Sequence, residues 1–172
     1  ETGLNGAKQL QPGFVRGRLL VNLDSETEGV FTVGCAGGRD VAITRALTWT
    51  DLPRGRQAMR LQVGGLCGGH SGIDIHRHRA NALKLLARTL IGLTAEGEVH
   101  LLQVSGGTRR NAIPRDAFAR LACPQEMTEV LCRRAAECQA LFRAEFAAET
   151  ALEVSVRREE SARERITALD AA

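Results

Sequence analysis

Two glycine-rich stretches carry the residue types in this sequence that could do chemistry. Residues 68–76 read Gly-Gly-His-Ser-Gly-Ile-Asp-Ile-His, and residues 106–114 read Gly-Gly-Thr-Arg-Arg-Asn-Ala-Ile-Pro. Glycines on both sides of His70 allow a close backbone turn that projects one imidazole outward. The second Gly-Gly turn leads to Asn111, and Pro114 fixes the backbone three residues later. The pattern therefore predicts a polar pair, His70 and Asn111, that is presented to a ligand.

Each member of the pair has other interpretations. His70 could simply fill space in a glycine-rich loop, or it could belong to a zinc site with Cys67, His76 and His78, although that spacing matches no standard zinc finger. The amide of Asn111 offers both a donor and an acceptor to a peptide carboxylate or carbonyl. It could instead stabilise an Asx turn at the entry to the following strand.

Composition narrows the class of protein. The chain has 172 residues, of which 44% are hydrophobic and 25% charged, which is typical of a globular domain. No apolar run reaches the length of a membrane span, and no signal peptide opens the chain. The five cysteines are odd in number and include no CxxC pair, which favours a reducing compartment. The net charge of +3 is spread among acids and aromatic residues are few, so neither a nucleic-acid nor a membrane partner is expected.

Periodicity predicts an α+β fold over residues 59–158. Short apolar alternations indicate strands at 59–63, 99–104, 114–123 and 152–156. Asn81 is a suitable cap for a helix with leucines at steps of three and four, and a longer helix is expected at 127–150. This β-α-β-β-α-β order predicts a four-stranded antiparallel sheet with two helices on one face.

The flanking segments are expected to belong to other layers. Residues 14–35 suggest two short buried strands around an acidic turn, and residues 39–49 a half-buried strand that leads into the sheet. Residues 159–172 suggest a further helix, with acids at its positive end.

Four motifs resemble, in order, those of aminoacyl-histidine dipeptidase, the Xaa-His (carnosine-splitting) member of the di-zinc exopeptidases. The resemblance runs from residue 1 to about residue 158. It rests on ETGLNGA at 1–7, NLDSETEGVFTVGCAGG at 22–38, GGHSG-x2-IH-x4-NA at 68–82 and GGTxRNAIPRDAFA at 106–119. Because such enzymes are far longer, the chain is interpreted as an internal piece. The resemblance implies a catalytic-domain remnant at 1–38, a lid or dimerisation domain at 39–158, and the helical start of a second lid half at 159–172.

The same resemblance implies residue roles. Glu1 and Asp24 match two metal ligands of a cytoplasmic dipeptidase that uses two zinc ions to activate water. His70 would reach from the lid to stabilise the developing oxyanion, and Asn111 would bind the substrate. Alone, the chain is expected to hold little or no zinc and to be inactive, since the other ligands and the general base are missing. Its expected partners are a dipeptide, the rest of the catalytic domain and a second copy of itself.

A different class of function stays open. An α+β module of this kind could act without chemistry, as a protein-interaction or dimerisation module that binds through an exposed sheet edge. The glycine-bracketed His70 favours the hydrolase, because an interaction module has no need for such a presented imidazole.

Overall fold

The chain divides into two compact units, Glu1–Thr44 and Arg45–Ala172. Within the described part of the first unit, the regular element is the short helix α1 (Asn5–Lys8). The second unit contains the sheet and the two long helices. This computed structural model describes residues 5–21, 23, 27–34, 37, 39, 41–47, 49–159 and 165–167.

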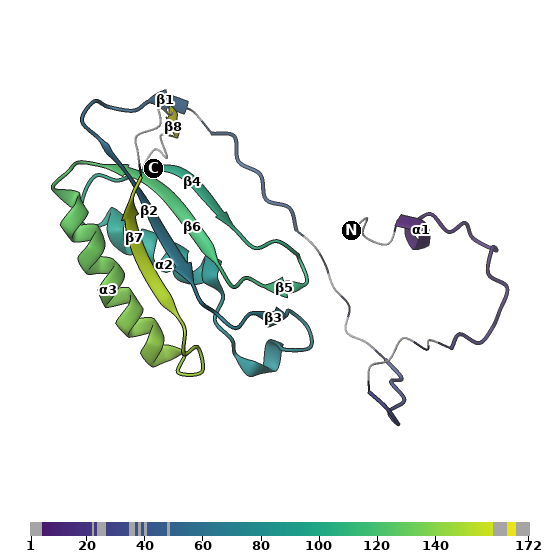
Figure 1. Cartoon of the computed structure of the whole chain (residues 1–172). Helices are drawn as coiled ribbons and strands as arrows, with labels where there is room; N and C mark the ends of the chain where they lie inside the picture. The colour runs from purple at the N-terminus through teal and green to yellow at the C-terminus, as the bar shows by residue number, and fades with distance from the viewer. Residues whose placement is uncertain are drawn as a thin grey trace. The chain divides into compact units, whose positions relative to one another are not determined.

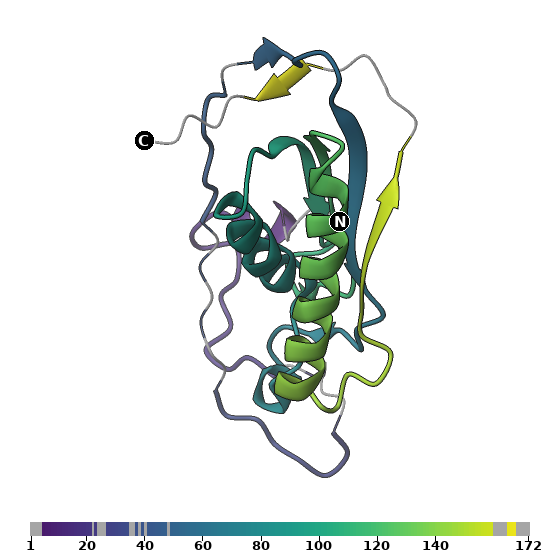
Figure 2. The same ribbon diagram turned by 90° about the vertical axis from the view of Figure 1, so that its left-hand side faces the viewer.

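The second unit is built on a four-stranded sheet in the order β4-β6-β2-β7, in which all neighbouring strands are antiparallel. Helices α2 and α3 cover one face of this sheet (Figures 1 and 2). The predicted fold class and the β-α-β-β-α-β order are confirmed. In chain order the elements are β2 (Gln57–Gly64), α2 (Ala82–Thr94), β4 (His100–Gly106), β6 (Ala117–Cys123), α3 (Met127–Glu145) and β7 (Glu153–Arg158).

The core lies between the helices and the sheet. In β2, Met59, Leu61 and Val63 alternate with the less buried Arg60 and Gln62, as expected for a strand with one apolar face. Each helix contributes one stripe of residues at steps of three and four. The buried residues of α2 are Ala82, Leu85, Leu86, Thr89 and Leu93, and those of α3 are Met127, Leu131, Ala135, Cys138 and Phe142.

The helix ends follow from local chemistry. Asn81 is the N-cap of α2, and its Oδ1 accepts a hydrogen bond from the Lys84 backbone N–H at 3.2 Å. Helix α3 ends at Glu145, five residues earlier than predicted, because the chain must turn back to place Leu152 beside the core. Among the described residues, no helix has both the length and the apolar character needed to cross a membrane.

The sheet face opposite the helices is polar. Arg60 and Arg120 are direct partners across β2 and β6. Both guanidinium groups pair with Glu159, at 3.7 Å from Arg60 and 2.6 Å from Arg120. Arg60 also lies over the ring of Phe118, 3.6 Å from its centroid. These contacts offset the repulsion between like charges on adjacent strands.

The segments before the sheet differ from the prediction. The described residues of 14–35 form no strand, and their apolar side chains are exposed, as in Phe31 at 96% and Leu20 at 86%. Residues 41–47 are also irregular, and a strand, β1 (Trp49–Asp51), begins only at Trp49. The physical reason is that alternation makes a strand only where a neighbouring strand supplies hydrogen bonds, and these described residues pair with none.

The terminal helix predicted at 159–172 is also wrong at its described residues 165–167. Arg165–Thr167 form strand β8, which pairs antiparallel with β1. Ile166 and Thr167 are β-branched and fit an extended backbone well once a partner strand is present. The tertiary pairing therefore overrides the local helical pattern.

Removing one core side chain tests this packing. We predict that Leu131→Ala, at a side chain with 0% exposure, lowers the free energy of unfolding by about 2–5 kcal/mol. The adjacent exposed Cys132→Ala should change it by less than about 0.5 kcal/mol. Urea unfolding followed by circular dichroism measures both, and equal losses at the two positions would contradict the described core.

Candidate functional site

The tertiary structure brings the two glycine-rich motifs together. Strand β3 (Gly69–His70) pairs antiparallel with β5 (Ala112–Ile113), so that His70 faces Ala112 across a two-stranded ribbon. The Ser71 backbone N–H donates to the Asn111 carbonyl oxygen at 2.9 Å. His70 and Asn111 are thus held in adjacent stretches of backbone, and both residues are exposed, as the sequence predicts.

The ring of His70 is fixed by its own turn. The backbone N–H groups of Gly72 and Ile73 both donate to His70 Nδ1, at 3.0 and 3.1 Å. A ring nitrogen that accepts hydrogen bonds carries no proton, so the neutral imidazole has its N–H at Nε2. The exposed ring therefore offers one oriented donor to a ligand.

Asp74 closes this turn from the other side. Its Oδ2 accepts a hydrogen bond from the His70 backbone N–H at 2.9 Å, while its own N–H donates to the His70 carbonyl at 3.0 Å. The carboxylate also pairs with Arg79 at 3.4 Å and Arg77 at 3.3 Å. Gly69, at a φ of +147°, leaves room for this arrangement, since a Cβ there would lie 2.6 Å from Asp74 Oδ2.

Asn111 sits in a turn that the backbone closes. The Ala112 N–H donates to the Arg109 carbonyl at 3.2 Å. The turn is therefore held by the main chain, and the exposed Asn111 amide is not needed to close it. This geometry suits a ligand-binding amide, whose role stays a prediction.

Several supporting residues were missed by sequence reasoning. Arg115 donates from Nε to the Leu66 carbonyl at 3.0 Å, and Arg79 donates to the Gly68 carbonyl. Asp74 had a local signal, since it lies four residues from His70 inside the glycine-rich stretch. Arg79 and Arg115 had none, because their partners are backbone carbonyls 11 and 49 residues away.

The possible metal ligands divide into two groups. Cys67, His70, His76 and His78 do not form a zinc site: the described residues include no group of three or more His, Cys, Asp or Glu side chains placed to hold a metal ion. Ile75–Arg77 instead form a short 3₁₀ turn, η1, that ends at His78 with a φ of 49°. The two ligands implied by the resemblance, Glu1 and Asp24, lie outside the described residues.

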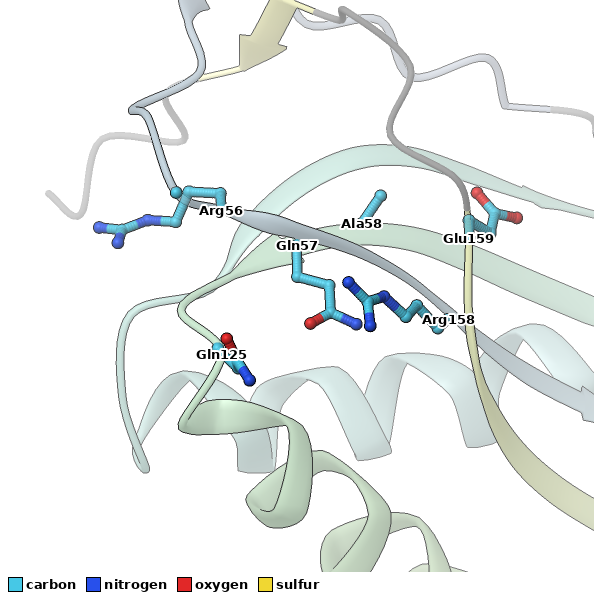
Figure 3. A pocket seen from close by; sticks show the side chains of 7 residues that line it. Arg56, Gln57, Ala58, Gln125, Arg158 and Glu159 are labelled. Carbon is cyan, nitrogen blue, oxygen red and sulfur yellow. The ribbon is translucent and has the colours of Figure 1, made fainter.

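Described residues of the second unit line pockets in two separate places. A pocket of about 370 Å³ adjoins the His70 segment and is bordered by Ile75, His78 and Arg79. A larger one, of about 550 Å³, lies at the opposite end of β2, where Gln57 and Arg158 extend beside one another near Gln125 (Figure 3). The larger pocket is therefore separated from His70 by the length of the strand, and the presented imidazole identifies the candidate site better than pocket size.

The peptidase dimerisation domain family matches residues 61–159, which is more than half of the chain. The chain belongs to the peptidase dimerisation domain family. The match covers the second half of β2 and all of α2, β4, β6, α3 and β7.

Two relatives of this dimerisation domain are dipeptidases. Over 131 residues it is 44% identical to the cytosol non-specific dipeptidase of Escherichia coli (strain K12), covering 76% of this chain and 27% of that protein. The crystal structure of aminoacylhistidine dipeptidase from Vibrio alginolyticus superposes with a TM-score of 0.79 at 36% identity, covering 98% of this chain and 34% of that one. The resemblance inferred from the four motifs is confirmed, and the chain spans about a third or less of these relatives.

The turn that orients His70 should depend on pH through Asp74. The hydrogen bond from the His70 backbone N–H, aided by the charges of Arg79 and Arg77, lowers the pKa of Asp74 against a smaller opposing effect of desolvation. Its stabilising contribution should therefore be complete above about pH 4, the ordinary value for Asp, and be lost as the pH falls through the lowered folded-state pKa. We expect the NMR shift of the His70 amide proton to show this transition between pH 5 and 2.

Asp74→Asn provides the control for this titration. The variant lacks the ionisable group, so the low-pH transition of the His70 amide should disappear while the remainder of the spectrum keeps its pH dependence. An identical transition in both proteins would mean that another group controls the turn.

Proposed function

We propose that this chain is the lid and dimerisation segment of a longer dipeptidase that hydrolyses Xaa-His dipeptides. The observation that carries the proposal is the doubly fixed Nδ1 of His70, which leaves one donor, Nε2–H, directed away from the turn. The similarity to two dipeptidases supports the reaction class.

His70 would act on the charge that develops during peptide hydrolysis. When water attacks the peptide carbonyl, the carbonyl oxygen becomes an oxyanion, and a donor already aimed at that position stabilises the transition state more than the substrate. The backbone bonds to Nδ1 mean that little reorganisation is needed at that moment. Asn111, in the turn immediately before β5, would bind the carboxylate or carbonyl of the dipeptide.

The proposal includes a division of the chain and a metal requirement. Residues 1–38 would belong to the catalytic domain, 39–158 to the lid, and 159–172 to the start of its second half. The resemblance implies a pair of zinc ions with Glu1 and Asp24 among their ligands. The described residues do not supply a metal site, so we assign no step of the reaction to the metals here.

The proposed surroundings follow from the relatives. The Escherichia coli relative is a cytosol enzyme, which supports a cytoplasmic location. The family is a peptidase dimerisation domain, which supports a second copy of the chain as a partner. Strand β7 is at one edge of the sheet, and such an interface would form along that edge beyond Val154, whose backbone N–H donates to Gln139 Oε1 at 2.9 Å.

A purely structural module is the second candidate, favoured by that same edge strand. The two candidates differ in what they require of His70. A module that only dimerises needs the sheet edge and the helices, whereas the hydrolase also needs the imidazole.

The decisive variant is His70→Ala in the full-length enzyme. Loss of a transition-state donor should lower kcat by about 100-fold or more with little change in KM. The thermal midpoint should be retained, since the ring is exposed. His76→Ala is the matched control, because His76 is also exposed and lies in the same segment, and it should keep most of the activity. An unchanged kcat for His70→Ala would favour the structural module.

A second prediction concerns the 172-residue chain by itself. A catalytic zinc ion takes about three protein ligands, and this chain offers one carboxylate for each of two ions. We predict that after dialysis it retains no stoichiometric zinc and hydrolyses neither carnosine nor Gly-His when zinc is added. Elemental analysis and the hydrolysis assay test this, and either bound zinc or turnover above the no-protein blank would show that the assigned ligand set is wrong.

A further inference from the structure

A buried carboxylate lies beneath the segment that carries His70. Glu149 is only 3% exposed and follows α3 in a turn that leads to β7. Its backbone is held on both sides, because its N–H donates to the Phe146 carbonyl at 2.8 Å and its carbonyl accepts from the Leu152 N–H at 3.0 Å. The side chain therefore projects from a fixed point of the scaffold.

Both oxygens of this carboxylate are used by the His70 segment. Oε2 accepts the Cys67 backbone N–H at 2.7 Å, and Oε1 accepts the Ala80 backbone N–H at 3.1 Å. Cys67 and Ala80 stand immediately before and after residues 68–79, which include the whole of β3, the turn around His70 and η1. One carboxylate thus holds both ends of the segment, residues 68–79, that presents the His70 imidazole.

We propose that Glu149 is a positioning residue for His70, acting as a clamp that fixes the separation of the two ends of residues 68–79. This inference rests on the proposed function of His70. The clamp would hold the His70 donor at a fixed place relative to the sheet.

Contacts within residues 68–79 connect the two clamped ends to His70. Arg79, next to the clamped Ala80, pairs with Asp74 at 3.4 Å, and Asp74 accepts the His70 backbone N–H at 2.9 Å. Arg79 also donates to the Gly68 carbonyl, next to the clamped Cys67. Each clamped end is therefore one residue away from a side-chain contact that leads toward His70.

A carboxylate is well suited to this task. Burying a charged group costs free energy unless its hydrogen-bonding capacity is used, and here each oxygen receives a backbone donor. An apolar residue of the same size would remove the acceptors of the buried Ala80 N–H and the part-buried Cys67 N–H.

The Cys67 thiol reports on the clamp directly. Its hydrogen bond to the Glu149 carboxylate, together with the negative charge of that group and desolvation, raises the pKa of Cys67, against smaller effects of Arg79 and Arg115. Loss of the carboxylate should therefore move the thiol titration to lower pH.

Glu149→Gln is the sharpest test, because it keeps the size of the side chain and leaves one oxygen to serve two donors. In the 172-residue chain, nitrogen-15 NMR of the His70 ring should show the Nε2–H tautomer dominant in the native protein and a mixture of tautomers in the variant. In the full-length enzyme, kcat should fall about 10- to 100-fold while KM stays nearly unchanged, as expected when a catalytic group is misplaced. Glu153→Gln removes the same charge from an exposed position on β7 and should change neither reading.

The outcomes separate this inference from the function on which it rests. If Glu149→Gln lowers the thermal midpoint but leaves the His70 tautomer and kcat as they were, Glu149 is only structural and the inference is overturned. If His70→Ala leaves kcat unchanged, the proposed function fails, while the tautomer measurement still decides whether the clamp orients the ring.

A measurement on the unaltered chain covers the case in which Glu149→Gln does not fold. The Cys67 and Ala80 amides should exchange with deuterium as slowly as amides inside β2, because both are bonded to a buried acceptor. Exchange at the rate of an open loop at either position would overturn the clamp.

Discussion

Strand β2 is hydrogen-bonded on both sides, to β6 and to β7, and the remaining structure depends on that central position. Because β2 has neighbours on both sides, the chain leaves the sheet only where the strand ends, at Gly64. Gly65 takes a φ of +74° there, and a Cβ would overlap the Ala151 carbonyl. The chain must then cross the end of the sheet to begin α2 on the helix side, and the crossing segment is the one that carries His70.

The two parts of this domain are stabilised by different means. The layer between sheet and helices is held by apolar burial, with Leu61, Leu131 and Phe142 almost fully enclosed. The His70 segment has few buried side chains and is held instead by polar contacts from Asp74 and Glu149 to its backbone. Apolar packing tolerates small shifts, whereas hydrogen bonds fix direction and distance. This division would suit the donor role that we propose for His70.

The candidate site lies away from the larger of the two pockets described above. The chain spans 27% of one dipeptidase relative and 34% of another, and under the proposed function it would supply one wall of a substrate site. In that proposal the presented His70 and the nearby Asn111 would line this wall. The larger pocket at the far end of β2 has neither residue.

Sequence alone determined the elements that bury a periodic face. The four strands of the main sheet and helices α2 and α3 follow from alternation and from stripes at steps of three and four, because each of them packs against the same core. The short strands β3 and β5 were not predicted, and β6 begins at Ala117, three residues later than expected. The glycine-bracketed His70 could be recognised for a similar reason, since its conformation is set by its immediate neighbours. Apolar alternation gave a wrong prediction in the described residues of 14–35, where no partner strand is present. The local helical pattern gave a wrong prediction at Arg165–Thr167, where β1 is present as a partner strand.

Only the tertiary structure decided which distant residues support the site. It paired β3 with β5 and placed Glu149 beneath both ends of the His70 segment, although Glu149 lies 82 and 69 positions away from its two partners. No sequence pattern marks such a contact, because its partners are backbone N–H groups, which every residue except proline possesses. Local rules describe what a segment prefers, and the acceptor that a buried N–H finds is fixed only when the chain has packed.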